Sequence, residues 1–160
     1  MVAFASCAPR ASVPSSAGPP TPAFGPILHQ AEGLFRNMKA RDYPAIWGLL
    51  SAKSRETIVS DVVRESGRLV AGTVDTGEIS KDFEQGGEIA RAYWEGYLRE
   101  FDPDTALLVS RWEMGKIEGD LAEIRITYGR SERPAVLRMI REGELWKVGL
   151  IETFRPRPLQ

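Results

Sequence analysis

The sequence contains one cysteine and one histidine among its 160 residues. With a single cysteine no intrachain disulfide can form, so packing must hold the fold together. With His29 as the lone imidazole, a metal site of several His ligands or a Cys/His nucleophile pair cannot be assembled within one chain. We therefore expect no metal, no cofactor and no catalytic residue set of these kinds.

The chain also lacks an excess of positive charge and a long apolar run. It has 21 Lys and Arg against 22 Asp and Glu, which gives a formal net charge of -1. Nucleic-acid binders need basic residues to displace counterions, so no nucleic-acid partner is expected. No apolar stretch approaches the roughly 18 residues that span a bilayer, so the protein itself is not expected to cross a membrane.

Residues 1–26 read as a leader and tether rather than as part of a domain. Six of the eleven prolines lie here, among Ser, Ala and Gly, and Arg10 is the only charged side chain. Proline removes amide donors and favours extended backbone, which predicts a disordered, partly polyproline-like segment. We expect a single domain over residues 27–154 and a flexible tail over 155–160.

The leader holds the only cysteine in the stretch Phe4-Ala5-Ser6-Cys7. This stretch resembles the lipobox of bacterial lipoproteins, in which a small residue precedes the Cys that receives the lipid. The resemblance implies lipidation of Cys7 and a periplasmic-side anchor in the bacterial cell envelope, with the remainder of the signal peptide encoded upstream of Met1. The alternative is a disordered N-terminus with a chance cysteine.

The first hundred residues follow a helical period and the next fifty a strand period. Apolar residues recur every three or four positions over 27–38, 46–63 and 79–101, and Asp102-Pro103 is expected to end the last helix. Alternation begins at Leu108, and short Gly-centred turns around Gly119 and Gly143 favour antiparallel pairing. The prediction is an α+β fold with N-terminal helices packed on a curved four-stranded antiparallel sheet, extended at its end by Ile151 and Glu152.

Two stretches resemble the nuclear transport factor 2-like superfamily. MKARDYPAIWGLLSAKSRETI is similar to its paired opening helices, and REGELWKVGLIETF is similar to its final hairpin. The resemblance implies a cone-shaped half-barrel that encloses a pocket. Members of the superfamily include isomerases, dehydratases, ligand binders and uncharacterised lipoproteins, so the fold does not settle the function.

Six aromatic residues are candidates for lining such a pocket. A ligand would meet ring faces and a few hydroxyl or indole groups, although rings that simply fill a helix-on-sheet core give the same pattern. The sequence leaves both interpretations open. The candidates are Tyr93, Trp94, Tyr97, Trp112, Tyr128 and Trp146.

Few polar residues are candidates for a catalytic or binding role. His29 lies beside the apolar stripe of the first helix and reads as a surface residue, with proton transfer as the alternative. Glu152 is in phase with apolar strand residues but sits near a strand end, where solvation is expected. Glu95 is expected to pair with other charges on the exposed side of its helix.

These observations favour a membrane-tethered envelope domain that binds a small apolar ligand or a protein partner without turnover. The alternative is a small isomerase or dehydratase that uses a carboxylate or His in the cone pocket, and a third possibility is an accessory domain with a solid core. An apolar outer sheet face predicts a homodimer. That face is expected to comprise Val136, Ile140, Leu145 and Ile151.

Overall fold

The computed structural model describes residues 24–69, 75–129, 131 and 133–154. Six helices come first in this part of the chain: α1 (Phe24–Ala40), α2 (Tyr43–Leu49), α3 (Ala52–Leu69), α4 (Thr76–Gln85), α5 (Glu88–Glu100) and α6 (Pro103–Leu108). Four strands follow, β1 (Ser110–Glu118), β2 (Leu121–Tyr128), β3 (Ala135–Glu142) and β4 (Leu145–Gly149), and then a short helix, α7 (Leu150–Thr153). The predicted α+β class is confirmed.

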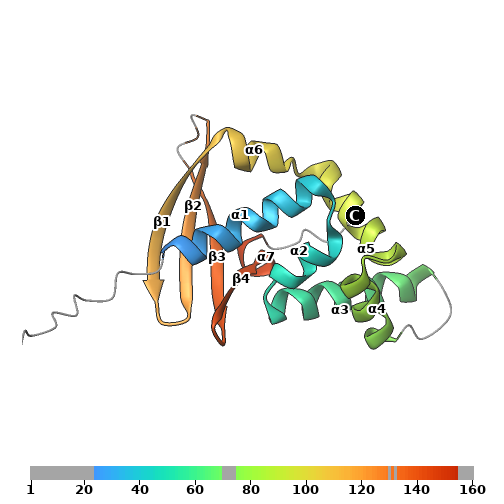
Figure 1. The fold of residues 1–160 in the computed structure, drawn as a ribbon. Helices are drawn as coiled ribbons and strands as arrows, with labels where there is room; N and C mark the ends of the chain where they lie inside the picture. Colours follow the sequence, from blue (N-terminus) through green and yellow to red (C-terminus); the bar gives the residue numbers. More distant parts are fainter. Residues whose placement is uncertain (1–23, 70–74, 130, 132, 155–160) are drawn as a thin grey trace, which may run out of the picture.

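The strands form one antiparallel sheet in the order β1-β2-β3-β4. Helix α1 runs across the sheet, and α2 to α5 gather on the opposite side of the molecule from β1 (Figure 1). The chain between α2 and α3 covers the β4 edge, because Leu50 forms a parallel bridge to Val148 and the Ser51 N–H donates to the Val148 carbonyl at 2.9 Å. The β1 edge carries an irregularity between Met114 and Ile117.

Alternation decides which sheet face is buried. Alternate residues of β2, β3 and β4 are almost fully covered by the helices, whereas their neighbours point to the other face. The covered residues are Ala122, Ile124, Ile126, Leu137, Met139 and Val148. On α1 the buried residues recur at three- and four-residue spacing, as expected of an amphipathic helix; they are Ile27, Ala31, Leu34, Phe35 and Met38.

Helix α1 ends in a left-handed residue. Arg41 has φ 57°, the Arg41 N–H donates to the Met38 carbonyl at 3.2 Å, and the Asp42 N–H donates to the Asn37 carbonyl at 3.0 Å. These two bonds are those of a Schellman motif, which satisfies carbonyls at the helix end. Asp42 then caps α2 by accepting from the Ala45 N–H at 3.1 Å, so the chain reverses with its backbone groups paired.

Three sequence-based expectations need correction. The turn after Pro103 is helical, because Asp102 caps α6 and Pro103 occupies its first position, where a missing N–H costs nothing. Leu108 therefore ends α6 and is 71% exposed instead of lying on the buried strand face. Ile151 and Glu152 belong to α7 and not to β4, since strand pairing stops at Gly149 opposite Arg138.

Candidate functional site

Four of the six predicted pocket aromatics belong to one continuous series of ring contacts. Tyr93 meets Trp94 with ring centroids 5.1 Å apart, and Trp94 meets Tyr97 at 5.7 Å. Each ring in the series packs on the next at 4.5–5.7 Å, mostly tilted or edge to face, as aromatic pairs prefer. We call these eight residues the aromatic series: Trp47, Phe83, Tyr93, Trp94, Tyr97, Phe101, Phe35 and Trp112.

The other two candidates lie apart from these ring contacts. Tyr128 is 57% exposed at the end of β2, and Trp146 is half-buried on β4. Trp112 lines a small hollow of about 280 Å³ between α1 and the start of β1, and its indole N–H donates to the Ala106 carbonyl at 2.8 Å. Ligand binding by these six residues stays a prediction.

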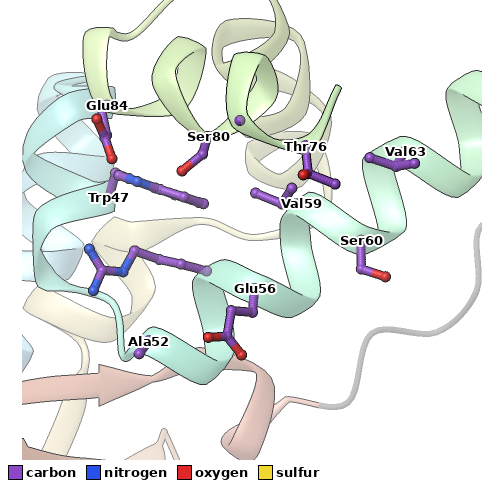
Figure 2. Close-up of a pocket in the computed structure, with 11 residues that line it drawn as sticks. Trp47, Ala52, Glu56, Val59, Ser60, Val63, Thr76, Ser80 and Glu84 are labelled. Carbon is purple, nitrogen blue, oxygen red and sulfur yellow. The ribbon is translucent and has the colours of Figure 1, made fainter. Parts of the chain in front are cut away.

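A larger groove of about 560 Å³ lies between α3 and α4. Trp47 on α2 lies between the two helices (Figure 2). Thr76 and Ser80 on α4 and Val59 on α3 line opposite sides of the groove. We call this site the α3/α4 groove. Its remaining lining residues are Ala52, Arg55, Glu56, Ser60, Val63, Gly77 and Glu84.

Trp47 is the distinctive residue of the groove. Its side chain is 2% exposed and stacks on Phe83 at 4.5 Å, yet its buried indole N–H has no hydrogen-bond partner within the described residues. A buried donor without an acceptor costs free energy. Trp94 has the same deficit but lies in the closed core, so Trp47 is the one of these two that borders a groove.

Charges of both signs surround the groove. Glu56 and Glu84 are exposed, and Arg55 is half-buried. In the view of Figure 2, the Glu84 side chain lies above the Trp47 ring at the same groove. The mixed charge favours neither a strongly anionic nor a strongly cationic occupant.

Glu152 is held by hydrogen bonds and is not freely solvated, which corrects the expectation from sequence. Its carboxylate accepts from the Ser51 hydroxyl at 3.0 Å and from the Ser54 hydroxyl at 2.7 Å. Both serines are buried, and Ser54 also accepts from the Ile151 N–H at 3.1 Å. The cluster pins α7 to the first turn of α3, which is a structural role.

Glu95 likewise differs from the expected surface pairing along its own helix. It accepts from the Tyr43 hydroxyl at 2.6 Å and forms an ion pair with Arg41 at 2.5 Å. The Tyr43 hydrogen bond and the Arg41 guanidinium lower the pKa of the Glu95 carboxyl. These contacts fasten α5 to the turn between α1 and α2.

Buried polar groups of a catalytic kind are not found in the described residues. Ser51 and Ser54 are the buried polar residues there, and His29 is exposed on α1. No group of three or more His, Cys, Asp or Glu suited to a metal ion occurs in the described ranges. Within these ranges no helix combines the length and apolarity that crossing a membrane requires.

Comparison with family models, curated proteins and solved structures found no match to this chain. The resemblance to the nuclear transport factor 2-like superfamily therefore stays a prediction.

Proposed function

We propose that this chain is a non-enzymatic binding domain, tethered to the bacterial cell envelope through a lipid on Cys7, that holds a small amphipathic molecule in the α3/α4 groove. The observation that carries the binding site is the Trp47 indole N–H, which is buried beside the groove and has no acceptor among the described residues. A ligand that supplies an acceptor offsets the cost of this unpaired donor.

The lining defines the chemistry of the occupant. Val59 and Val63 offer apolar surface along α3, whereas Thr76 and Ser80 offer hydroxyl groups along α4. Small-molecule sites commonly combine apolar walls with a few polar groups that fix orientation. The expected ligand has an apolar body, a hydrogen-bond acceptor for the indole, and a polar side that faces α4.

The position of the acidic groups supports binding without turnover. A general base that acts on an apolar substrate is expected to be desolvated. Glu56 and Glu84 at the groove are exposed, and Glu152 already accepts from two serine hydroxyls. The described groove thus offers hydrogen bonds and apolar contact.

Titration with the amphipathic dye anilinonaphthalene sulfonate tests the groove. The dye should bind the wild type at one saturable site. Trp47→Phe keeps a ring on Phe83 but removes the indole N–H, so the dye affinity should fall by roughly five- to tenfold, the effect of about one hydrogen bond.

Trp112→Phe is the matched control, because that indole lines the smaller hollow and already has an acceptor in Ala106. It should leave dye affinity unchanged, and circular dichroism should show both variants folded. Absence of saturable dye binding, or equal affinities of the wild type and Trp47→Phe, would overturn the proposed groove.

The tether requires a separate test, since Cys7 lies outside the described residues. Mass spectrometry of protein expressed with the sequence upstream of Met1 should show acyl chains on Cys7. A Cys7 thiol without acyl mass would remove the lipid anchor from the proposal and leave the groove unaffected.

A further inference from the structure

The sheet face turned away from the helices carries exposed apolar side chains. Leu121 is 58% exposed, Leu145 54% and Val136 36%, and Ile140 is half-buried beside them. We call this surface the outer sheet face. Contiguous exposed apolar surface commonly marks an interaction site.

One row of side chains across the four strands of this face is complementary to itself when its direction is reversed. Strand register places Glu118 beside Leu121, Leu121 beside Ile140, and Ile140 beside Lys147. Across the four strands the row is therefore acidic, apolar, apolar and basic. When the same row of a second copy is laid over it in the reverse direction, acidic residues face basic residues and apolar residues face apolar residues.

The two central residues of the neighbouring row are also complementary to a reversed copy of themselves. Glu123 on β2 lies beside Arg138 on β3. Neither side chain belongs to an ion pair within the described part of the chain. A reversed copy would place Glu123 opposite Arg138 and Arg138 opposite Glu123.

We infer that the outer sheet face binds the same face of a second copy of this chain. The two-fold axis runs parallel to the strands, between β2 and β3, so that β2 of each copy lies over β3 of the other. Leu121 then meets Ile140 of the second copy, and Glu123 meets its Arg138. Such an isologous contact is the commonest way for one surface to pair with itself, and aligned packing of two sheets is a standard arrangement.

The pair Glu123 and Arg138 is the main reason to expect a second copy of this chain as the partner. Lys147 already donates to the Gly48 carbonyl at 2.6 Å, and Glu118 pairs with Lys116, so the outer charges are shared with other groups. Charge complementarity at Glu123 and Arg138 favours this register, because it places opposite charges in contact. The proposal is independent of the α3/α4 groove.

Single charge reversals test the pairing. The wild type should be dimeric by analytical ultracentrifugation. Glu123→Arg and Arg138→Glu each create two like-charge contacts in a symmetric dimer, and each should raise the dimer dissociation constant by about tenfold or more. Glu100→Arg makes the same charge change at an exposed position, the last residue of α5, and should leave the dissociation constant unchanged.

Mixing the two single variants provides the decisive measurement. In the mixed dimer, the introduced arginine faces the introduced glutamate, and native Arg138 faces native Glu123. Within each chain, however, positions 123 and 138 still carry like charges. Recovery of dimers on mixing therefore reports contact between copies and not an effect on the fold of one copy.

Three results would overturn the inference. They are a monomeric wild type at all concentrations, a mixture that dimerises no better than its components, and a loss of dimers in Glu100→Arg equal to that in the sheet-face variants. Circular dichroism of each variant confirms that folded chains are compared. A dimer that persists in both single variants would place the contact elsewhere and also contradicts the inference.

Discussion

At the scale of single residues, two glycines in the left-handed region differ in their surroundings. Gly86 ends α4 with φ 66°, and a Cβ at this position would lie 2.8 Å from the Pro44 Cδ atom. Gly143, in the β3–β4 turn, has φ 63° but no heavy atom within 4 Å of the same point. Both need a residue that tolerates positive φ, and Gly86 also needs the space.

Gly86→Ala should therefore lower the free energy of unfolding more than Gly143→Ala. The change at Gly143 carries only the left-handed strain, about 1 kcal/mol. Gly86→Ala adds the clash with Pro44, for a total of about 2–3 kcal/mol. Urea denaturation of both variants measures the difference, and equal losses would show that α4 and α2 do not approach each other as described.

At the scale of elements, the beginning of α3 joins segments that are distant in sequence. Glu142 of β3 accepts from the Ala52 N–H at 2.7 Å, and Glu152 of α7 accepts from Ser51 and Ser54. Carboxylates are favoured near a helix N-terminus, where the backbone N–H groups lack partners. This junction holds the end of the described chain against the helices.

Glu152→Gln should destabilise the protein by about 1–2 kcal/mol, because one charged acceptor of two serine hydroxyls is lost. Glu144→Gln is a matched control, since the Glu144 side chain is 95% exposed, and it should change stability by less than about 0.5 kcal/mol. Chemical denaturation compares them. Equal stability of the wild type and Glu152→Gln would contradict the anchoring role.

The elements themselves could largely be predicted from sequence. Period-three and period-four spacing marked the helices, and the alternation from Ala122 to Ile126 marked β2 and its buried face. Helix α7 was missed because Val148, Leu150 and Glu152 continue a strand-like alternation. Only the fold reveals that Ser51 and Ser54 lie where they bind Glu152.

At the scale of the whole molecule, the aromatic series runs from the α3/α4 groove to the sheet. Its rings come from α1, α2, α4, α5, the residue that follows α5, and β1, so the helices and the sheet share one core. Sequence could identify aromatic residues but not their contacts. It also could not identify the groove, because Trp47, Val59 and Ser80 come together through tertiary packing. That the Trp47 indole lacks an acceptor in the described part of the chain leaves no signal in the sequence either.

Two partly buried tyrosines, Tyr93 and Tyr97, predict a loss of stability at high pH. Burial raises the pKa of Tyr97 to about 12 and raises the pKa of Tyr93 as well. The folded-state pKa of Tyr97 exceeds the usual value of 10, so folding favours the neutral hydroxyl. The stability that Tyr97 contributes is therefore complete below pH 10 and is lost as the pH rises towards 12.

Tyr97→Phe keeps the ring but removes the ionisable hydroxyl, so its stability should decline less steeply above pH 10 than that of the wild type. Tyr128→Phe, at an exposed position, should leave the alkaline decline unchanged. Urea unfolding at increasing pH measures this. Identical declines in the wild type and Tyr97→Phe would place the Tyr97 ring outside the core.

The most direct test of the binding account is nuclear magnetic resonance of the four indole N–H groups during titration with anilinonaphthalene sulfonate. Trp47 borders the α3/α4 groove, whereas Trp94, Trp112 and Trp146 are the candidates for the predicted cone pocket. The account predicts that the Trp47 resonance shifts with dye and that the other three stay in place. A stationary Trp47 resonance with shifts at Trp94, Trp112 or Trp146 would contradict it.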